Sequence, residues 1–251
     1  MSKFINIMPM AGLGKRFLNS NYKLPKALIN ISDKPMFIQA AKSMPSSNSN
    51  IFICNKKLID YFKINKILIN KFNKKFKLIS VKRTTKGQAN TCMLATKFLN
   101  NDDSIFVQSC DSLITYSKTK LIDLVNNSDA VILTTKPNKI HLANINSYGW
   151  VSIKNKKIIN ITCKKQASNS PYNDKVIIGS FAFKSKKIFS RMIRNLFKIK
   201  KKINNEYYID MAFSHALKNN MNIKNLTVKS YESWGTPQEL KNWETKIVKN
   251  K

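Results

Sequence analysis

"MPMAGLGKRF", residues 8–17, follows the apolar run Phe4–Met8 and places two of the chain's six glycines beside a lysine and an arginine. Backbone that passes close to a ligand needs glycine, because a Cβ would collide with that ligand. A strand that ends in such a turn and leads into a helix presents several backbone N–H groups to an anion. The stretch therefore predicts an α/β core with a phosphate-binding turn at the end of its first strand.

Short apolar runs alternate with helical patterns along the first two-thirds of the chain. Strands are expected at Phe4–Met8, Ile51–Cys54, Phe76–Val81, Ser104–Ser109 and Ala130–Thr135. Helices are expected near Met36–Met44, Leu58–Ile69, Ala89–Leu99 and Thr119–Val125. This alternation is typical of a three-layer α/β/α, Rossmann-like core around a mixed, mainly parallel sheet.

The pattern changes after Pro137 and becomes rich in strands. "YGWVSIKNKKIINIT" predicts a hairpin, and "VIIGSFAFKS" predicts a strand before helices near Lys186–Leu196 and Tyr208–Lys218. "IKNLTVKSYESW" predicts one late strand, and Thr236 with Pro237 predicts the cap and first position of a terminal helix. We interpret this part as a β-rich lid or insertion on one α/β core.

The formal net charge of +32 predicts an anionic partner, such as nucleic acid, anionic lipid or a phosphorylated small molecule. The lysines are spread among asparagines and isoleucines, and the modules diagnostic of nucleic-acid binding are missing from the sequence. A solvated basic surface is therefore favoured over specific nucleic-acid binding. The densest basic run, Lys198–Asn205, is expected to be an exposed connection between helices.

The cellular compartment is predicted to be the cytoplasm. No apolar run approaches the roughly 18 residues that a membrane span needs, and the N-terminus shows no signal-peptide pattern. Cys54, Cys92, Cys110 and Cys163 lie far apart without zinc-site spacing, so we expect reduced thiols that are mostly buried.

Further motifs follow the glycine-rich stretch. Leu24-Pro25-Lys26 comes within one loop length, and "DKPM" follows it. Together these motifs resemble the sugar-phosphate nucleotidyltransferases (pyrophosphorylases), especially the branch found in polysaccharide and capsule gene clusters. The remaining glycines lie in segments similar to those of the family, namely "KGQANT", "SYGWV", "IIGSFAF" and "WGTPQEL". The resemblance covers essentially the whole chain.

The resemblance implies one nucleotidyltransferase domain over residues 1–251. Residues 1–137 would form the nucleotide-binding half, and residues 138–251 the acceptor-binding half with the C-terminal helix. The implied reaction joins a nucleoside triphosphate to a sugar 1-phosphate, or another small phosphomonoester, and releases pyrophosphate. A phosphomonoester with a second pKa of about 6 is largely dianionic at neutral pH, so the reaction needs no general base. This suits a chain whose two histidines match no catalytic pattern.

The resemblance also assigns roles to individual residues. Arg16 is expected on the leaving pyrophosphate, because a planar guanidinium suits two phosphate oxygens. Lys26 and Lys164 are expected to neutralise phosphate charge during the reaction. The implied nucleotide-binding residues are Met10, Ala11, Gly12, Leu13, Gly14, Lys15, Gly87, Gln88 and Ser109. The implied acceptor-binding residues are Tyr148, Gly149, Gly179, Glu206 and Trp234. Asp210, four residues after Glu206, can share its helix face.

A magnesium site is expected at Asp111. This aspartate ends the apolar run "SIFVQSC", where a parallel strand would meet the ligand cleft, and Mg²⁺ takes one or two carboxylates plus substrate phosphates. Many family members carry a second aspartate where this chain has Ser233. Glu232 is the expected second ligand if a bulge or the turn before Gly235 redirects it, and otherwise one carboxylate and water would hold the ion. The family's Glu-Lys-Pro stretch is Cys163-Lys164-Lys165 here, which keeps the lysine and lacks the glutamate.

Three alternatives stay open at this stage. A glycosyltransferase would usually carry Asp-x-Asp at the metal strand, whereas this chain has Cys110-Asp111-Ser112. A non-catalytic polyanion-binding protein would follow from the net charge, and a relative with an impaired metal site could act as a sensor. The sequence identifies neither the nucleotide base nor the acceptor nor the oligomeric state.

Overall fold

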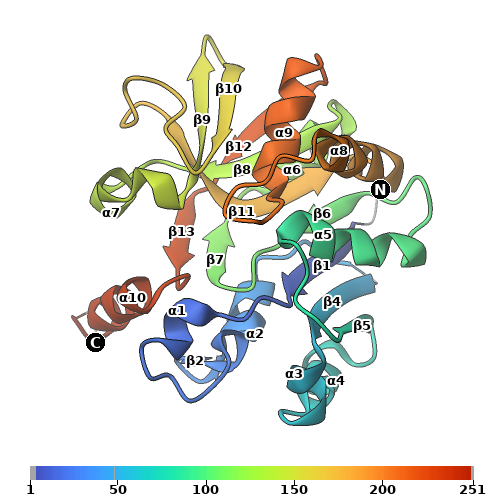
Figure 1. The fold of residues 1–251 in the computed structure, drawn as a ribbon, viewed down its shortest axis with the longest axis vertical. Coiled ribbons are helices and arrows are strands. Elements are labelled where there is room, and N and C mark those ends of the chain that lie inside the picture. The colour runs from blue at the N-terminus through green and yellow to red at the C-terminus, as the bar shows by residue number, and fades with distance from the viewer. Residues whose placement is uncertain (1–3, 48, 250–251) are drawn as a thin grey trace.

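Strand β1 (Ile5–Met10) lies inside the main sheet of the computed structural model, which describes residues 4–47 and 49–249 (Figure 1). It runs parallel to β4 and β6, and β4 runs parallel to β5. These neighbours are β4 (Ser49–Asn55), β5 (Phe76–Val81) and β6 (Ile105–Val107). The N-terminal part therefore forms the parallel unit that the alternation of apolar runs predicts.

The rest of the main sheet is mixed. Strand β11 (Lys175–Phe183) runs antiparallel to β6, to β8 (Ala130–Thr135) and to β9 (Gly149–Lys154). Strand β12 (Ile223–Thr227) extends the sheet parallel to β8. The expected hairpin is confirmed as β9 and β10 (Lys157–Cys163), which rises from the sheet in Figure 1. The parallel order ends at β6, because β11 enters beside it in the opposite direction.

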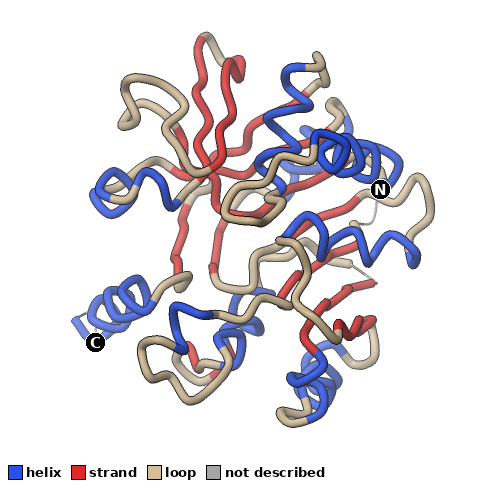
Figure 2. The backbone as a smooth tube through the Cα atoms, viewed as in Figure 1, coloured by secondary structure: helices blue, strands red, loops and turns tan. Residues whose placement is uncertain are grey.

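Helices cover both faces of this sheet (Figure 2). Successive side chains of a strand point to opposite faces, and the two cores follow that rule: Met8 packs in one and Ile7 in the other. The first core includes residues of α2 (Met36–Ala41), α4 (Ile64–Phe72) and α6 (Lys118–Asn126). The second includes residues of α5 (Gln88–Met93), α8 (Lys186–Ile199) and α9 (Ile209–Lys218). The three-layer α/β/α expectation is confirmed.

Two expected helices are divided. The region 58–69 holds α3 (Lys56–Asp60) and then α4, because Lys63 between them adopts a left-handed conformation with φ of 49°. The region 89–99 holds α5 followed by the 3₁₀ turn η2 (Leu94–Phe98). Apolar periodicity continues across both breaks, so the pattern alone does not reveal them.

The expected late strand is two strands. After β12, the chain leaves the main sheet and forms β13 (Ser230–Ser233), which pairs antiparallel with β7 (Ser112–Thr115). This two-stranded ribbon leads to α10 (Pro237–Lys249), whose Glu239 N–H donates to Thr236 Oγ1 at 3.1 Å as the capping prediction requires. The ribbon brings residues 233–236 beside Asp111, whose carbonyl accepts from Trp234 N–H at 2.8 Å.

Short elements connect these parts. They are α1 (Lys15–Leu18), η1 (Lys26–Leu28), β2 (Asn30–Ile31), β3 (Lys34–Pro35), α7 (Lys139–Ala143) and η3 (Ile145–Ser147). The basic run from Lys198 to Asn205 links α8 to α9 and is mostly exposed, as expected.

The cysteines are mostly buried, as expected. The four cysteines are free thiols, and Cys54, Cys92 and Cys163 are buried. Within residues 4–47 and 49–249, no helix is both long and apolar enough to cross a membrane.

Candidate active site

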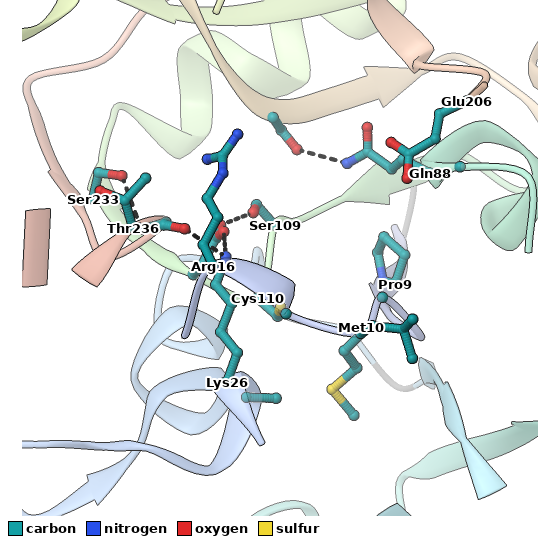
Figure 3. A pocket seen from close by; sticks show the side chains of 18 of the residues that line it. Pro9, Met10, Arg16, Lys26, Gln88, Ser109, Cys110, Glu206, Ser233 and Thr236 are labelled. Carbon is teal, nitrogen blue, oxygen red and sulfur yellow. Dashed lines mark hydrogen bonds and ion pairs between the residues drawn. The ribbon is translucent and has the colours of Figure 1, made fainter. Parts of the chain in front are cut away.

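A cavity of about 930 Å³ opens where the parallel strands end. Its wall includes Met10 at the end of β1, Asn55 at the end of β4, and Ser109 just after β6. The carboxyl ends of parallel strands are where open α/β sheets bind their ligands. In Figure 3, Ser233 and Thr236 lie at one side of this cavity and Gln88 and Glu206 at the other, with Arg16 between them.

The glycine-rich turn forms one rim of the cavity. Gly14 precedes α1 in the left-handed region with φ of 63°, and a Cβ there would lie 3.0 Å from Lys26 Cβ. Gly14 therefore lets the turn pack against the Pro25-Lys26 segment. A Cβ added to Gly12 would have no other atom within 4 Å, so the space beside this glycine is open toward the cavity that it lines. Arg16, one residue into α1, is exposed and extends into the cavity (Figure 3).

Lys26 and Asp111 form an ion pair on the cavity wall. The Lys26 ammonium also donates to the Gly235 carbonyl at 3.1 Å, and Asp111 Oδ1 accepts from the Ser109 hydroxyl. Burial raises the pKa of Asp111, but the Lys26 charge and the hydrogen bonds from Lys26 and Ser109 outweigh it and hold that pKa below its ordinary value. Burial lowers the pKa of Lys26, but Asp111 outweighs it and raises that pKa. The pair is therefore charged at neutral pH.

A second lysine, Lys164, also lines the cavity. Lys164 directly follows β10, and its ammonium donates to the Ser147 carbonyl and lies 5.4 Å from the centre of the Tyr208 ring. Burial lowers the pKa of Lys164, and the nearby Asp210 carboxylate partly opposes that effect. Asp210 sits in the first turn of α9 and also lines the cavity. Burial raises the pKa of Asp210 to about 6 against the opposing charge of Lys164.

Gly87 and Gln88 come from the start of α5 and are fixed by their neighbours. A Cβ on Gly87 would lie 2.7 Å from both Tyr207 N and Tyr207 O, so only glycine fits there. The Gln88 amide donates to the Gly179 carbonyl at 3.4 Å across the cavity (Figure 3). Gln88 keeps further donor and acceptor capacity, because a side-chain amide offers two donors and one carbonyl oxygen.

The second carboxylate beside Asp111 belongs to Glu239 and not to Glu232. The Glu232 carboxylate forms an ion pair with Lys246 and lines a smaller neighbouring cavity, which shares Ser233 and Glu239 with the main one. Glu232 does not line the main cavity, because β13 is regular and the side chains of Glu232 and Ser233 point to opposite faces. The expectation of a bulge that redirects Glu232 is wrong. Glu239, three residues after Thr236, accepts from Thr236 Oγ1 and from Tyr148 Oη, both at 3.1 Å.

The space at Gly235 fits a divalent cation. A Cβ on Gly235 would lie 3.1 Å from Glu239 Oε2, 3.4 Å from Asp111 Oδ2 and 3.5 Å from Ser233 Oγ, so three oxygens surround a volume that a side chain would fill. Across the residues that the structure describes, no group of three or more His, Cys, Asp or Glu gathers at one point. Two carboxylates suffice for Mg²⁺, because substrate phosphates and water commonly complete its octahedron.

Most of the residues predicted for the site line this one cavity. They are Met10, Ala11, Gly12, Leu13, Gly14, Arg16, Lys26, Gly87, Gln88, Ser109, Asp111, Tyr148, Gly149, Lys164, Gly179 and Glu206. Three predicted residues do not line it: Lys15 is exposed outside the cavity, Glu232 lines the smaller neighbouring cavity, and Trp234 is buried. Trp234 packs edge-on against Trp243 at a centroid distance of 5.7 Å, so its role is to anchor α10 in the core.

Sequence reasoning missed some of the lining residues. Glu239 completes a Thr-x-x-Glu pattern that predicts a helix cap, and nothing in that pattern tells that its carboxylate faces a cavity. Tyr231 alternates with Ser233 on β13 and lines the cavity as well, which period-2 alternation could have predicted once the ribbon was known.

Asp210→Asn is expected to raise the free energy of unfolding at pH 8 by about 1–2 kcal/mol. The pKa of Asp210 is raised to about 6 in the folded state, so the folded protein binds this proton more tightly than the unfolded chain does. The wild type therefore loses stability as the pH rises through about 4 to 6, and asparagine removes that loss. Denaturant unfolding at pH 8 and pH 4 measures the difference.

The control for this prediction is Asp102→Asn, which changes an exposed aspartate outside the cavity. Its unfolding free energy is expected to stay within about 0.5 kcal/mol of wild type at both pH values. Stability of Asp210→Asn below wild type at pH 8 would contradict the argument, because it would show that the ionised carboxylate stabilises the fold.

Comparisons with known proteins bear on the family and the fold of this chain. A family model described as "Nucleotidyl transferase" matches residues 6–247. A search of curated proteins finds no match to the sequence. The fold is similar to that of a nucleoside-diphosphate-sugar pyrophosphorylase from Vibrio cholerae RC9, with a TM-score of 0.76, 18% identity, and coverage of 95% of this chain and 99% of that chain.

Two further solved structures share the fold. An inositol-1-phosphate CTP transferase from T. maritima has a TM-score of 0.74 at 15% identity, covering 97% of this chain and 95% of that chain. A UTP-bound UGPase from Acinetobacter baumannii has a TM-score of 0.70 at 16% identity, covering 98% of this chain and 93% of that chain. At these identities the likeness shows the fold.

Proposed function

Since this chain belongs to the nucleotidyl transferase family, we propose that it joins a nucleoside triphosphate to a sugar 1-phosphate or a similar small phosphomonoester. The products are a nucleotide-activated compound, of the kind that polysaccharide synthesis consumes, and pyrophosphate. The observation that carries this proposal is that three cationic side chains, Arg16, Lys26 and Lys164, line one cavity. Two anionic substrates that repel each other need such a cavity before they can react.

The proposed reaction is an attack of an acceptor phosphate oxygen on the α-phosphorus of the triphosphate. A new P–O bond forms there, and the bond between the α-phosphorus and the bridging oxygen breaks, so that pyrophosphate leaves with the electron pair. Lys164 would hold the acceptor phosphate, and Arg16 would bind the leaving pyrophosphate through two parallel hydrogen bonds. Lys26 would neutralise charge that moves between them. No residue has to remove a proton, because the acceptor phosphate is largely ionised at neutral pH.

The fit of the Gly235 region supports a divalent cation as a cofactor, which we propose to be Mg²⁺. Asp111 and Glu239 would hold it, with Ser233 beside them. When bound, the ion would supply positive charge to the phosphates. Lys26, which already contacts Asp111, would then turn its ammonium toward the substrate.

The two halves of the chain would divide the substrates between them. The glycine-rich turn and Gln88 come from residues 1–137 and would bind the nucleotide, whereas Tyr148, Lys164 and Glu206 come from residues 138–251 and would bind the acceptor. In this proposal the positive charge of the chain serves small phosphorylated substrates and not nucleic acid. A cytoplasmic location, where nucleoside triphosphates are abundant, agrees with four free thiols.

Pyrophosphate release tests the proposal directly. The purified chain is assayed with Mg²⁺ and each of ATP, CTP, GTP, UTP and dTTP, against a panel of sugar 1-phosphates, sugar 6-phosphates and choline phosphate. We expect release that requires one triphosphate and one acceptor together. Release without an acceptor, or none with any pair, would overturn the assignment.

The same preparation separates the alternatives. A glycosyltransferase would consume nucleotide sugars without releasing pyrophosphate. A polyanion-binding protein would bind single-stranded DNA with an affinity that falls steeply as salt rises, because counterion release drives such binding.

A further inference from the structure

The Asp210 carboxylate enters the cavity through a gap in the wall that Gly149 leaves open. Gly149 is the first residue of β9, and a Cβ on it would overlap Asp210 Oδ2 and lie 2.8 Å from Ile177 Cδ1. Real Cβ contacts are never that short, so the position holds glycine because the carboxylate occupies the side-chain space. The glycine predicted as an acceptor contact thus acts here by admitting a carboxylate from α9.

Asp210 lies beside the cation proposed to bind the acceptor phosphate. The Lys164 backbone N–H donates to the Tyr148 carbonyl at 3.0 Å, which fixes this lysine next to Tyr148 and Gly149. Lys164 and Asp210 influence each other electrostatically, yet among the described residues they form no direct ion pair. Asp210 therefore keeps a carboxylate oxygen free for another partner.

The cavity lacks a carboxylate on the neighbouring strand. Residue 163, which precedes Lys164, is a buried cysteine that does not line the cavity and cannot accept strong hydrogen bonds. Asp210 lies close enough to that thiol to raise its pKa further after burial has done so. Asp210, which comes from α9, therefore provides a carboxylate beside the end of β10, where β10 itself has no carboxylate.

We infer that Asp210 is a specificity-determining residue that binds acceptor hydroxyl groups through the gap at Gly149, and that the acceptor is a polyhydroxylated phosphomonoester. This inference rests on the proposed function. An ionised carboxylate only accepts hydrogen bonds, so its partner must donate them, as sugar or polyol hydroxyls do. Glu206 lines the same end and adds a second acceptor group.

The surroundings disfavour an aminoalcohol phosphate at this end. A quaternary ammonium group is bound by open aromatic faces, but the face of Tyr208 is already covered by the Lys164 ammonium. That ammonium would also repel a second cation beside it, and this repulsion opposes the attraction that Asp210 and Glu206 would exert on such a group. Hydroxyl groups have no such conflict, because they are neutral.

The energetic cost of Asp210 agrees with a binding role. Burial raises its pKa to about 6, so the ionised carboxylate destabilises the folded protein at neutral pH. Residues that lower stability yet contribute to ligand binding are typical of functional sites. A residue that only supported the fold would show the opposite sign.

The test compares acceptor binding in wild type, Asp210→Asn and Gly149→Ala. Calorimetric titrations use glucose 1-phosphate, its monodeoxy analogues, mannose 1-phosphate and choline phosphate, each with a non-hydrolysable triphosphate present. We expect Asp210→Asn to weaken binding of the preferred sugar phosphate by about 10- to 100-fold, the loss of a charged hydrogen bond. Triphosphate affinity is expected to change less than 2-fold. Asp102→Asn serves as the matched control.

A double variant separates binding from folding. Gly149→Ala should weaken acceptor binding as much as Asp210→Asn does, because the new methyl group displaces the Asp210 carboxylate. In the Asp210→Ala background the overlap with the carboxylate disappears and only the end of the Ile177 side chain has to shift, so Gly149→Ala should then add less than 3-fold. If Gly149→Ala alone fails to fold, the double variant and Asp210→Asn still decide the question.

Two results would overturn the inference while leaving the proposed function intact. One is a wild-type preference for choline phosphate. The other is an equal loss, in Asp210→Asn, for the complete sugar phosphate and for each of its deoxy analogues, because a carboxylate that binds no hydroxyl cannot distinguish them. A wild type that releases no pyrophosphate with any substrate pair overturns the proposed function instead.

Discussion

Arg16→Ala is expected to lower kcat by about 1,000-fold while leaving the fold intact, because phosphoryl-transfer sites depend this strongly on a single arginine. The side chain is exposed and extends into the cavity from α1 (Figure 3), so its removal leaves no hole in the core. Its proposed partner is the leaving pyrophosphate, whose charge grows as the bond breaks. The loss should therefore appear in kcat more than in KM for the triphosphate.

Two further variants test the geometry of this interaction. Arg16→Lys keeps the charge but removes the planar fork, and we expect it to recover only a small part of the rate. Lys15→Ala is the matched control, because this neighbouring cation is exposed and lies outside the cavity wall. Kinetics of pyrophosphate release at saturating triphosphate provide the measurement. Full activity of Arg16→Lys would show that only charge matters at this position.

The fold could be predicted from the sequence because its strands are short, apolar and separated by helical patterns. Residues such as Ile7 and Met8 belong to two cores on opposite faces of one sheet, and a strand buried on both faces shows as a continuous apolar run. The hairpin Gly149–Cys163 was equally clear from its polar turn. The breaks at Lys63 and Leu94 were not, because apolar periodicity continues across them.

The candidate site was predictable where a motif fixes the backbone. Gly87 marks a position at which only glycine fits, Gly14 has a left-handed conformation and packs tightly against Lys26, and both lie on the cavity wall. The prediction failed where tertiary structure decides which way a side chain points. Trp234 was expected to face the acceptor, but it anchors α10 in the core. The Glu239 carboxylate on α10 faces the main cavity and the Glu232 carboxylate on β13 does not. No local sequence pattern encodes the direction in which either side chain points.

Asp111→Asn is expected to lower metal-dependent turnover by about 1,000-fold, since it removes a carboxylate from the proposed cation site and from the ion pair with Lys26. The variant also leaves the partly buried Lys26 ammonium without its counter-ion, so the free energy of unfolding should fall by about 1–3 kcal/mol. Binding of Mn²⁺ with bound triphosphate, followed by electron paramagnetic resonance, gives a readout that does not depend on turnover. We expect that signal to weaken together with the rate.

Variants of Glu239 and Glu232 test whether the loss of turnover in Asp111→Asn arises at the cation site. Glu239→Gln should raise the Mg²⁺ concentration needed for half-maximal rate by about 10-fold, because its carboxylate lies with that of Asp111 around Gly235. Glu232→Gln is the matched control, since its carboxylate pairs with Lys246 behind β13, and its Mg²⁺ dependence should equal that of wild type. If Glu232→Gln shifts the dependence and Glu239→Gln does not, the site lies on the other side of the ribbon. Wild-type Mn²⁺ binding in Asp111→Asn would show that Asp111 does not bind the ion, because neutralising a carboxylate ligand weakens binding of the ion.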